Sequence, residues 1–354
     1  MSLEFIDGFD HYISAAQAAL KWSSVFGGTS GQGGKFSGSS YELDNNAQNL
    51  TMTGMANQQT RTIGFNVRLT SGMGSGTTGP GILLAGLYDG ATLQVQLGFL
   101  GNGALVVSRG GTVVLGTTAV NAVSLSNWYY VELRATIGST VGSFDLYVDG
   151  LLILSATGVN TQASTNAYSN SVAFWGNNPA FVYIDDVYIL NSLGIVNNGP
   201  LGPIRVLTAL PTGDSAVNHS WTPLTAGPHY KMVYDPSNPG PDGDTTYNYS
   251  STVGQIDTYT GWPDPAPVPA NTTTPSGVIA GVQTVLDGRL DTGANQISEE
   301  CRDSTGVNHD GANTFSLTSS YAMYRQVRET DPGTAAAWTA ANLNASEFGV
   351  KLVS

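Results

Sequence analysis

Charged residues, and basic residues above all, are scarce in this sequence of 354 residues. It has 13 Lys and Arg against 26 Asp and Glu, which gives a formal net charge of −13. We exclude a nucleic-acid partner on this ground, because neutralising phosphates requires many Lys and Arg side chains. The same balance argues against an anionic membrane surface. Since amphipathic helices usually carry many Glu, Lys and Arg, the shortage also favours strands and polar loops.

Cysteine is almost absent as well. The one thiol, Cys301, has no second cysteine with which to form a disulfide or a zinc site. The four histidines do not pair at a spacing typical of metal ligands. We therefore expect the fold to be stabilised by packing, alone or together with oligomerisation.

Targeting and membrane-spanning signals are also lacking. The N-terminal stretch MSLEFIDGFDHYI has no basic segment followed by an apolar run, so we expect no signal peptide. No window is long and apolar enough to span a bilayer, so we expect no membrane insertion. These features predict a protein that is made in the cytosol.

Alternation of apolar and polar residues is what the sequence has in abundance. Residues 62–70 place Phe65 and Val67 on one face, and residues 127–154 contain two further alternating runs. Pairs such as Asp89-Gly90 predict hairpin turns, because they tolerate positive φ. One packed and one solvated face per strand is typical of antiparallel sheets in a sandwich.

The alternating pattern is interrupted once by a long aperiodic stretch. Residues 191–203, NSLGIVNNGPLGP, are rich in Asn, Gly and Pro. We predict a first domain over residues 1–192, a linker over 193–203 and a second domain over 204–354. The length of the chain also fits two domains better than one.

Two short helices interrupt the predicted strands. Residues 11–22 could share an apolar helical face, and Thr339 could cap a short Ala-rich helix near the C-terminus. Residues 204–211 are predicted as the first strand of the second domain. The fold class is thus all-β, with two antiparallel, jelly-roll-like β-sandwich domains and a short helix near the C-terminus.

The first half resembles a known fold family in its strand motifs. NWYYVELRATI (127–137) followed by GSFDLYVDGLLIL (142–154) resembles the central hairpin of concanavalin A-like jelly rolls, especially the laminin G-like group. YIDDVYIL (183–190) is similar to the closing strand of that family, which pairs near the N-terminal strand, here LEFIDGFD (3–10). The family includes enzymes, lectins and passive interaction modules, so the resemblance implies a fold more than a function.

The second half resembles a domain found among structural proteins of tailed bacteriophages. The resemblance covers residues 244–260 and is closest over 324–353. It implies a component of the virion surface, assembled in the host cytoplasm, with other virion proteins as partners. It also implies a symmetric homo-oligomer such as a trimer.

Catalytic and cofactor-binding residues are not apparent, so we predict no enzyme and no cofactor. The glucanase branch of the jelly-roll family carries Glu-x-Asp-x-x-Glu on one strand, which this sequence lacks. Asp185 and Asp186 are adjacent, and we expect their side chains to point to opposite faces of a strand. They could not then act as an acid and a nucleophile across one bond.

A structural calcium ion is the one metal that the sequence could hold. DPSNPGPDGD (235–244) offers several oxygen donors, although it lacks the spacing and the terminal Glu of an EF-hand loop.

Four aromatic residues are candidates for contact with a sugar or a partner. Trp175 and Tyr168 could form a stacking platform, and so could Tyr130 and Tyr147 if they face each other on the solvated side of the sheet. Aromatic side chains on such faces also pack against neighbouring subunits.

Three functions are consistent with these observations. The leading hypothesis is a non-enzymatic virion structural protein, decorating the phage head or projecting from its tail. The alternative is a carbohydrate-binding adhesin that recognises host cell-surface glycans. A polysaccharide hydrolase is the third hypothesis, and it requires a pair of carboxylates that face one cleft.

Overall fold

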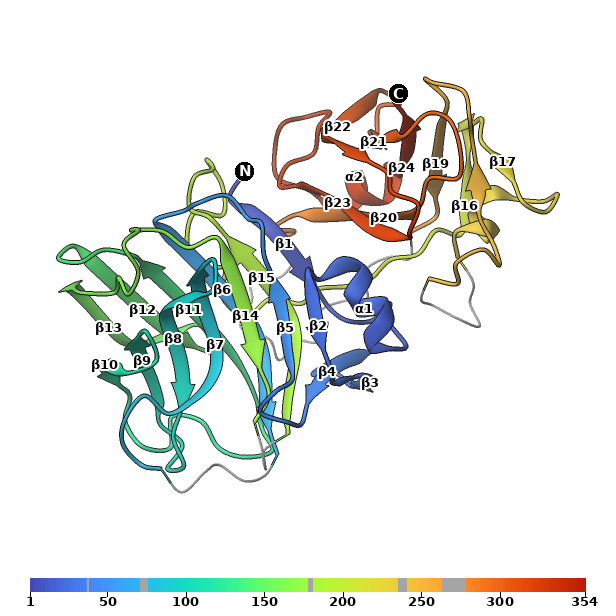
Figure 1. Cartoon of the computed structure of the whole chain (residues 1–354). Coiled ribbons are helices and arrows are strands. Elements are labelled where there is room, and N and C mark those ends of the chain that lie inside the picture. The colour runs from blue at the N-terminus through green and yellow to red at the C-terminus, as the bar shows by residue number, and fades with distance from the viewer. Residues whose placement is uncertain (37, 71–75, 178–180, 235–240, 263–277) are drawn as a thin grey trace. The chain divides into compact units, whose positions relative to one another are not determined.

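The computed structural model describes residues 1–36, 38–70, 76–177, 181–234, 241–262 and 278–354. By its internal contacts the chain divides into two compact units, Met1–Val206 and Leu207–Ser354. Both are built mainly of antiparallel strands (Figure 1). The prediction of an all-β fold with a short helix near the C-terminus is confirmed.

The first unit contains two large sheets. The eight-stranded sheet runs, in spatial order, β13 (Leu151–Val159), β12 (Gly142–Val148), β11 (Trp128–Thr136), β6 (Thr60–Leu69), β15 (Val182–Leu190), β4 (Ser39–Leu43) and β3 (Thr29–Gly33), with β1 (Leu3–Asp7) also paired to β15. The seven-stranded sheet runs β10 (Val113–Thr117), β9 (Leu105–Arg109), β8 (Thr92–Phe99), β7 (Ile82–Asp89), β14 (Ser171–Trp175), β5 (Asn49–Met52) and β2 (Ser24–Phe26).

The core of the first unit lies between these two sheets. Alternate residues of β6, such as Phe65 and Val67, are buried there, as the apolar period of two predicts. The ring of Phe65 meets that of Phe174 on β14 edge to face, with centroids 4.9 Å apart. Each large side chain buried in this way contributes roughly 1.5–3 kcal/mol, so the two layers are held together mainly by apolar burial.

The N-terminal strand and helix are joined by a buried polar cluster centred on Asp7. The helix predicted within residues 11–22 is α1 (Ala15–Lys21). At its end Lys21 pairs with Asp7 at 3.3 Å, and the Trp22 indole N–H donates to the same carboxylate at 2.8 Å. Burial opposes ionisation of Asp7, but Lys21 and the hydrogen bonds outweigh it and keep the pKa of this carboxyl below its usual value.

The segment after β15 is hydrogen-bonded to the first unit. Residues 201–206, which we call the strap, overlap the predicted linker 193–203. Three backbone N–H groups of the strap donate to Tyr188, Glu132 and Asp186, at 3.1, 2.9 and 2.7 Å. All three acceptors are buried side chains of the eight-stranded sheet. The strap therefore covers part of a sheet face that the alternation pattern alone assigns to solvent.

The second unit is built on a five-stranded sheet. Its order is β16 (Gly213–His219), β19 (Ile256–Thr260), β24 (Glu347–Leu352), β21 (Gln296–Arg302) and β22 (Asn308–Ser316). Two-stranded ladders add β20 (Val282–Gly288) with β23 (Ala322–Arg328), and β17 (Thr222–Pro223) with β18 (Asn248–Tyr249). The strand predicted over residues 204–211 is wrong, because no strand forms before Gly213. The N–H of Val206 donates to the Asp186 carboxylate and not to a neighbouring strand.

A smaller core holds the second unit together. Cys301, Trp338 and Phe348 are buried in contact with one another, and Val282 packs against them. The helix α2 (Ala340–Ala345) begins as predicted, since the Thr339 hydroxyl accepts the N–H of Asn342 at 3.1 Å. The described helices are short, and none of them could cross a membrane.

Gly64, in the centre of β6, lets the ring of Tyr188 lie flat on the sheet beneath the strap. A Cβ at this position would overlap the Tyr188 ring. We predict that Gly64→Ala destabilises the first unit by about 1–3 kcal/mol, the range for overpacking. Calorimetry of the full chain should show its unfolding transition lowered by roughly 2–4 °C per kcal/mol. Gly33→Ala is the matched control, because a Cβ there meets nothing within 4 Å; equal effects of the two changes would contradict the prediction.

Candidate functional site

The outer face of the seven-stranded sheet, turned away from the core, carries an aromatic and apolar strip. Leu87 and Val95 point into the core, so Tyr88, the next residue of β7, faces outward. A register shift between Leu87 and Tyr88 leaves Gln94 outside the ladder and brings Leu93 onto the same face. Tyr88 and Leu93 are paired directly across these strands. Both side chains lie over Gly86, where an added Cβ would come within 2.7 Å of Leu93 and 2.8 Å of Tyr88. The glycine thus forms the floor on which the two side chains meet.

Trp175, the last residue of β14, extends this strip. Its indole N–H donates to the Tyr88 hydroxyl at 3.0 Å, and both side chains are half-buried. Burial raises the pKa of Tyr88, so this hydroxyl stays protonated and can donate in turn. Of the two residues, only Trp175 is among the candidates predicted from the sequence. The alternation within residues 82–89 could have predicted Tyr88, because consecutive strand residues face opposite ways and Leu87 is apolar.

A loop formed by residues 160–168 is fixed beside the β7–β8 hairpin by two side chains, Gln94 and Asp89. The Gln94 side-chain carbonyl accepts the N–H of Ala163 at 2.6 Å, and its amide donates to the Tyr168 carbonyl at 3.1 Å. Asp89 accepts the Ser164 hydroxyl at 2.7 Å. Gln94 is fully buried by these contacts. The loop is therefore pre-organised, and Tyr168 takes part in the site through its backbone carbonyl.

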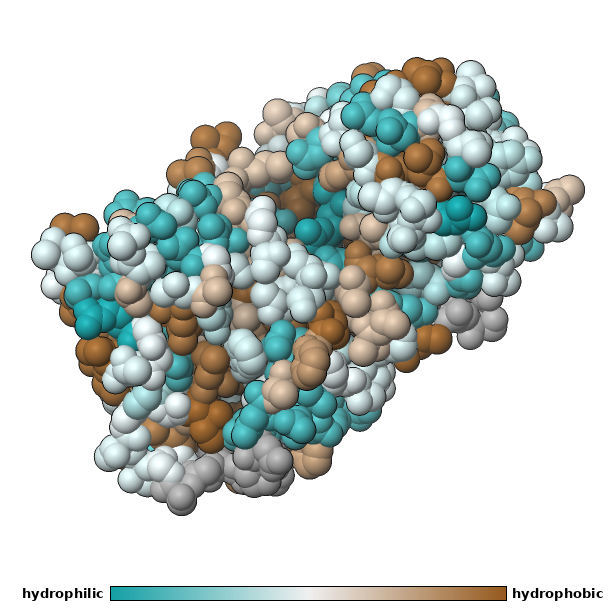
Figure 2. All heavy atoms as spheres, in the orientation of Figure 1, coloured by the Kyte–Doolittle hydropathy of each residue, from teal (hydrophilic) through white to brown (hydrophobic). Residues whose placement is uncertain are grey.

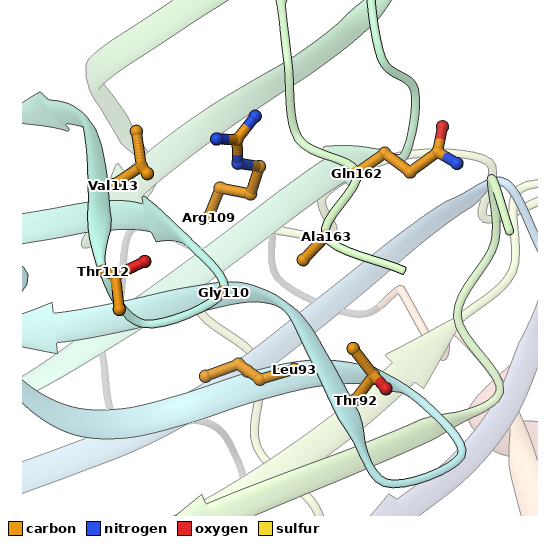
Figure 3. Close-up of a pocket in the computed structure, with 8 residues that line it drawn as sticks. All are labelled: Thr92, Leu93, Arg109, Gly110, Thr112, Val113, Gln162 and Ala163. Carbon is orange, nitrogen blue, oxygen red and sulfur yellow. The ribbon is translucent and has the colours of Figure 1, made fainter. Parts of the chain in front are cut away.

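A pocket of about 410 Å³ opens between this loop and the β9–β10 hairpin (Figure 3). It is lined by Thr92, Leu93, Arg109, Gly110, Thr112, Val113, Gln162 and Ala163. Gly110 and Gly111 make the hairpin turn with φ of +57° and +70°, a conformation that strongly favours glycine. Leu93 lines the pocket and is paired with Tyr88, so the pocket adjoins the Tyr88–Trp175 pair at Leu93. Arg109 is the ladder partner of Val95 and therefore leaves the sheet on the side of the core, opposite to Tyr88 and Trp175.

The other predicted aromatic pair does not form an exposed platform. Tyr130 is fully buried, its ring stacks on Tyr188 with centroids 6.3 Å apart, and its hydroxyl donates to the Asp186 carbonyl at 3.1 Å. The expectation that Tyr130 faces solvent is therefore wrong. The alternation pattern predicts that this face of β11 is exposed to solvent, but the strap covers part of the face in the structure. Tyr147, on β12, is half-buried in the same sheet, away from Trp175.

Asp185 and Asp186 also depart from the prediction, because both carboxylates lie on one side of the sheet. Asp186 has φ of +50° within a β-bulge that interrupts the register of β15 with β6. The bulge breaks the alternation, so the Asp186 carboxylate accepts the Asn66 amide at 2.7 Å while Asp185 accepts the Lys35 N–H at 3.0 Å. Both acids are almost completely buried, which leaves them no access to a substrate.

Metal ligands do not gather anywhere in the described ranges: no group of three or more His, Cys, Asp or Glu side chains is arranged to hold an ion. Most of the predicted calcium loop, residues 235–240, lies outside the described residues. In its remainder Asp242 accepts the Thr246 hydroxyl at 2.7 Å, and Asp244 pairs with Arg289 at 2.9 Å.

Comparison with known proteins gives distant structural similarity only. No protein-family model matches the sequence, and no curated protein matches it significantly. Among solved structures, the chain is similar to a botulinum neurotoxin type G receptor-binding domain at 16% identity and a TM-score of 0.32, over 48% of this chain and 41% of that one. It is similar to a Trypanosoma rangeli sialidase in complex with sialic acid at 17% identity and a TM-score of 0.31, over 43% and 25%.

A third similar structure is the alginate lyase Aly36B, at 12% identity and a TM-score of 0.37, over 58% of this chain and 98% of the lyase. The chain thus spans about two fifths of the neurotoxin domain and a quarter of the sialidase. With TM-scores this low, no function is transferred from these proteins. The antiparallel two-sheet architecture of the first unit agrees with the coarse fold that the jelly-roll resemblance implies.

The buried acids beneath the strap predict a pH-dependent stability. Burial raises the pKa of Asp185, and the neighbouring Asp186 raises it further. A carboxyl whose pKa is raised by folding holds its proton more tightly in the native state, so stability is greatest below the unfolded pKa of about 4 and falls as the pH rises towards the native pKa. Each tenfold difference in proton affinity between the native and unfolded states corresponds to about 1.4 kcal/mol of stability.

We therefore expect the melting temperature of the first unit to fall between pH 5 and pH 8.5, and to fall less in Asp185→Asn, which mimics the protonated acid. Asp44→Asn removes the same charge from an exposed position and controls for the overall negative charge. Equal pH dependence in the two variants, measured by calorimetry, would show that Asp185 is not responsible.

Proposed function

We propose that the first unit is a non-catalytic carbohydrate-binding module, and that the Tyr88–Trp175 pair together with the adjoining pocket is the binding surface. The observation that carries the proposal is that the Tyr88–Trp175 pair adjoins a 410 Å³ pocket at Leu93. Aromatic side chains with one polar end offer a flat apolar surface together with a hydrogen bond, which suits a sugar ring. The pocket combines apolar side chains such as Leu93 and Val113 with polar ones such as Thr112 and Arg109, and small-ligand sites also combine the two kinds.

The rigidity of the site supports the same proposal. Gln94 and Asp89 fix the 160–168 loop by hydrogen bonds of 2.6–3.1 Å, and the Trp175 indole is held by Tyr88. A pre-organised surface loses less conformational entropy on binding, which favours affinity for ligands that make few contacts. Sugars gain little net free energy per contact, because their hydroxyls must give up hydrogen bonds to water, so a pre-organised surface suits them.

The lack of reactive groups around the pocket supports a binding role over a hydrolytic one. Its eight lining residues include no carboxylate, histidine or cysteine. A glycoside hydrolase of the usual type needs an acid and a base or nucleophile on either side of the scissile bond. The acids that do lie close together, Asp185 and Asp186, are buried in the other sheet.

A glycan array probed with the full chain tests this function. We expect specific hits whose affinity falls by about tenfold in Trp175→Ala, corresponding to about 1.4 kcal/mol for the lost aromatic contact. The matched control is Trp128→Ala, since Trp128 is also half-buried but lies on the eight-stranded sheet beside Arg68. An array without hits, or equal losses in the two variants, would contradict the proposal.

A second candidate function is assembly into a particle, and the edge strand β13 favours it. Its sequence, LLILSATGV, has no charged residue and no proline, the usual devices that protect an edge from pairing. Leu151 and Leu152 are 71% and 53% exposed. We infer that β13 pairs with β13 of a second copy. The resemblance of residues 324–353 to phage structural proteins supports a virion as the particle, which mass spectrometry of purified particles would test.

Light scattering of the purified chain tests the self-association. We expect an oligomer that loses mass in Leu152→Lys, because a charge on the edge opposes strand pairing. Leu193→Lys places the same charge at another exposed position, outside the sheet. A monomeric native chain at micromolar concentration, or loss of the oligomer in both variants, would argue against β13 as the contact.

A further inference from the structure

We propose that the pocket beside the β9–β10 hairpin binds the anionic group of an acidic sugar, and that Arg109 is the residue that selects it. This inference rests on the proposed carbohydrate-binding function and specifies its ligand class. The shared chemistry is an oxyanion attached to a sugar ring, either a carboxylate, as in a uronic acid, or a sulfate ester.

The first observation is that Arg109 has no partner within the part of the chain that the structure describes. No hydrogen bond, ion pair or ring contact engages its guanidinium. Other arginines are engaged: Arg61 pairs with Glu4, and Arg328 with Glu299. With 26 acids for 13 bases in the sequence, an arginine with a structural role would readily meet a carboxylate. Arg109 is left available at a pocket instead.

The second observation is the direction of the side chain. Figure 3 shows the Arg109 guanidinium between Val113 and Gln162, inside the ring of residues that line the pocket. A guanidinium presents several N–H donors in one plane, which matches the two oxygens of a carboxylate and also binds sulfate oxygens. The pocket is concave, so part of the water around the bound anion is displaced and the interaction is stronger than on an open surface.

The third observation is that the remaining lining residues suit the rest of a sugar. Thr92 and Thr112 carry hydroxyls that can donate and accept, while Leu93 and Ala163 supply an apolar surface. The volume of about 410 Å³ lies in the range of roughly 300–1,000 Å³ typical of small-molecule sites. Beyond Leu93 the surface continues to Tyr88, so neighbouring units of an oligosaccharide have an aromatic surface to follow.

The net charge of the chain makes the selection of acidic sugars depend on Arg109. At a net charge of −13 the protein repels anionic polymers at long range. Binding of an acidic glycan then depends on a local cation that is not already neutralised. We expect the preference for acidic over neutral glycans to be lost when that single cation is removed.

Calorimetric titration of the full chain with matched oligosaccharides tests the inference. Three probes share one backbone: an oligo-uronate, its carboxyl-reduced neutral form, and the neutral form carrying sulfate esters. We expect the native chain to bind an acidic probe at least tenfold more tightly than the neutral one. Arg109→Gln should abolish this preference, and Arg109→Lys should retain part of it. Arg134→Gln, which removes an arginine from β11 in the other sheet, should leave it unchanged.

Each outcome decides one of the two proposals. Preference for the uronate or for the sulfated probe, lost in Arg109→Gln, supports the inference and identifies the anion. Equal affinity of the native chain for neutral and acidic probes, with loss of binding in Trp175→Ala, overturns the inference and leaves carbohydrate binding in place. Unchanged preference in Arg109→Gln also overturns it. No binding of any glycan, here and on the array, overturns both.

Discussion

The two-residue period of the strands, interrupted at a few β-bulges, is the constraint on which the rest of this structure depends. It buries alternate side chains between the two sheets of the first unit and turns the others outward. In most sandwiches charged residues solvate the outer faces, but this chain has few of them. Uncharged polar and aromatic side chains take their place, such as Gln94, Asn66 and Tyr130, and all three are fully buried. Each outer face is therefore covered in part by a segment that its polar groups hold in place.

The two covered faces show what such hydrogen bonds do. Gln94 holds the 160–168 loop through both ends of its amide, and the strap is held by Asp186, Glu132 and Tyr188. Buried acids are costly to ionise, so they contribute less to stability than to fixing one arrangement of the chain above them. Burial raises the pKa of Glu132 and Asp186, and the attachment of the strap therefore depends on pH as well as on sequence.

The elements with local signals could be predicted from the sequence. The alternating strands and the Thr339 cap of α2 agree with prediction, and the long-range pairing of β1 with β15 agrees with what the jelly-roll resemblance implies. The burial of Tyr130 could not be predicted, because the strap over this sheet face comes from a segment about 70 residues later in the chain. The position of the Asp186 carboxylate depends on one residue with positive φ, which no pattern in YIDDVYIL signals.

The candidate site shows the same division between local and long-range information. Trp175 is conspicuous in the sequence, whereas Arg109 and Gln162 lie 53 positions apart and belong to one pocket only after β8, β9 and the 160–168 loop are assembled. The glycines of the β9–β10 turn combine a local signal with a long-range contact. Their positive φ follows from the hairpin. Because Gly110 has no side chain, Ala163 can lie 3.3 Å from the point where a Cβ of Gly110 would be. Hairpin geometry thus closes one wall of the pocket while the fixed loop forms the other. The backbone of Arg109, on the strand that leads into that turn, is fixed in the ladders with β8 and β10, which places the base of its side chain, unpaired among the described residues, at the pocket.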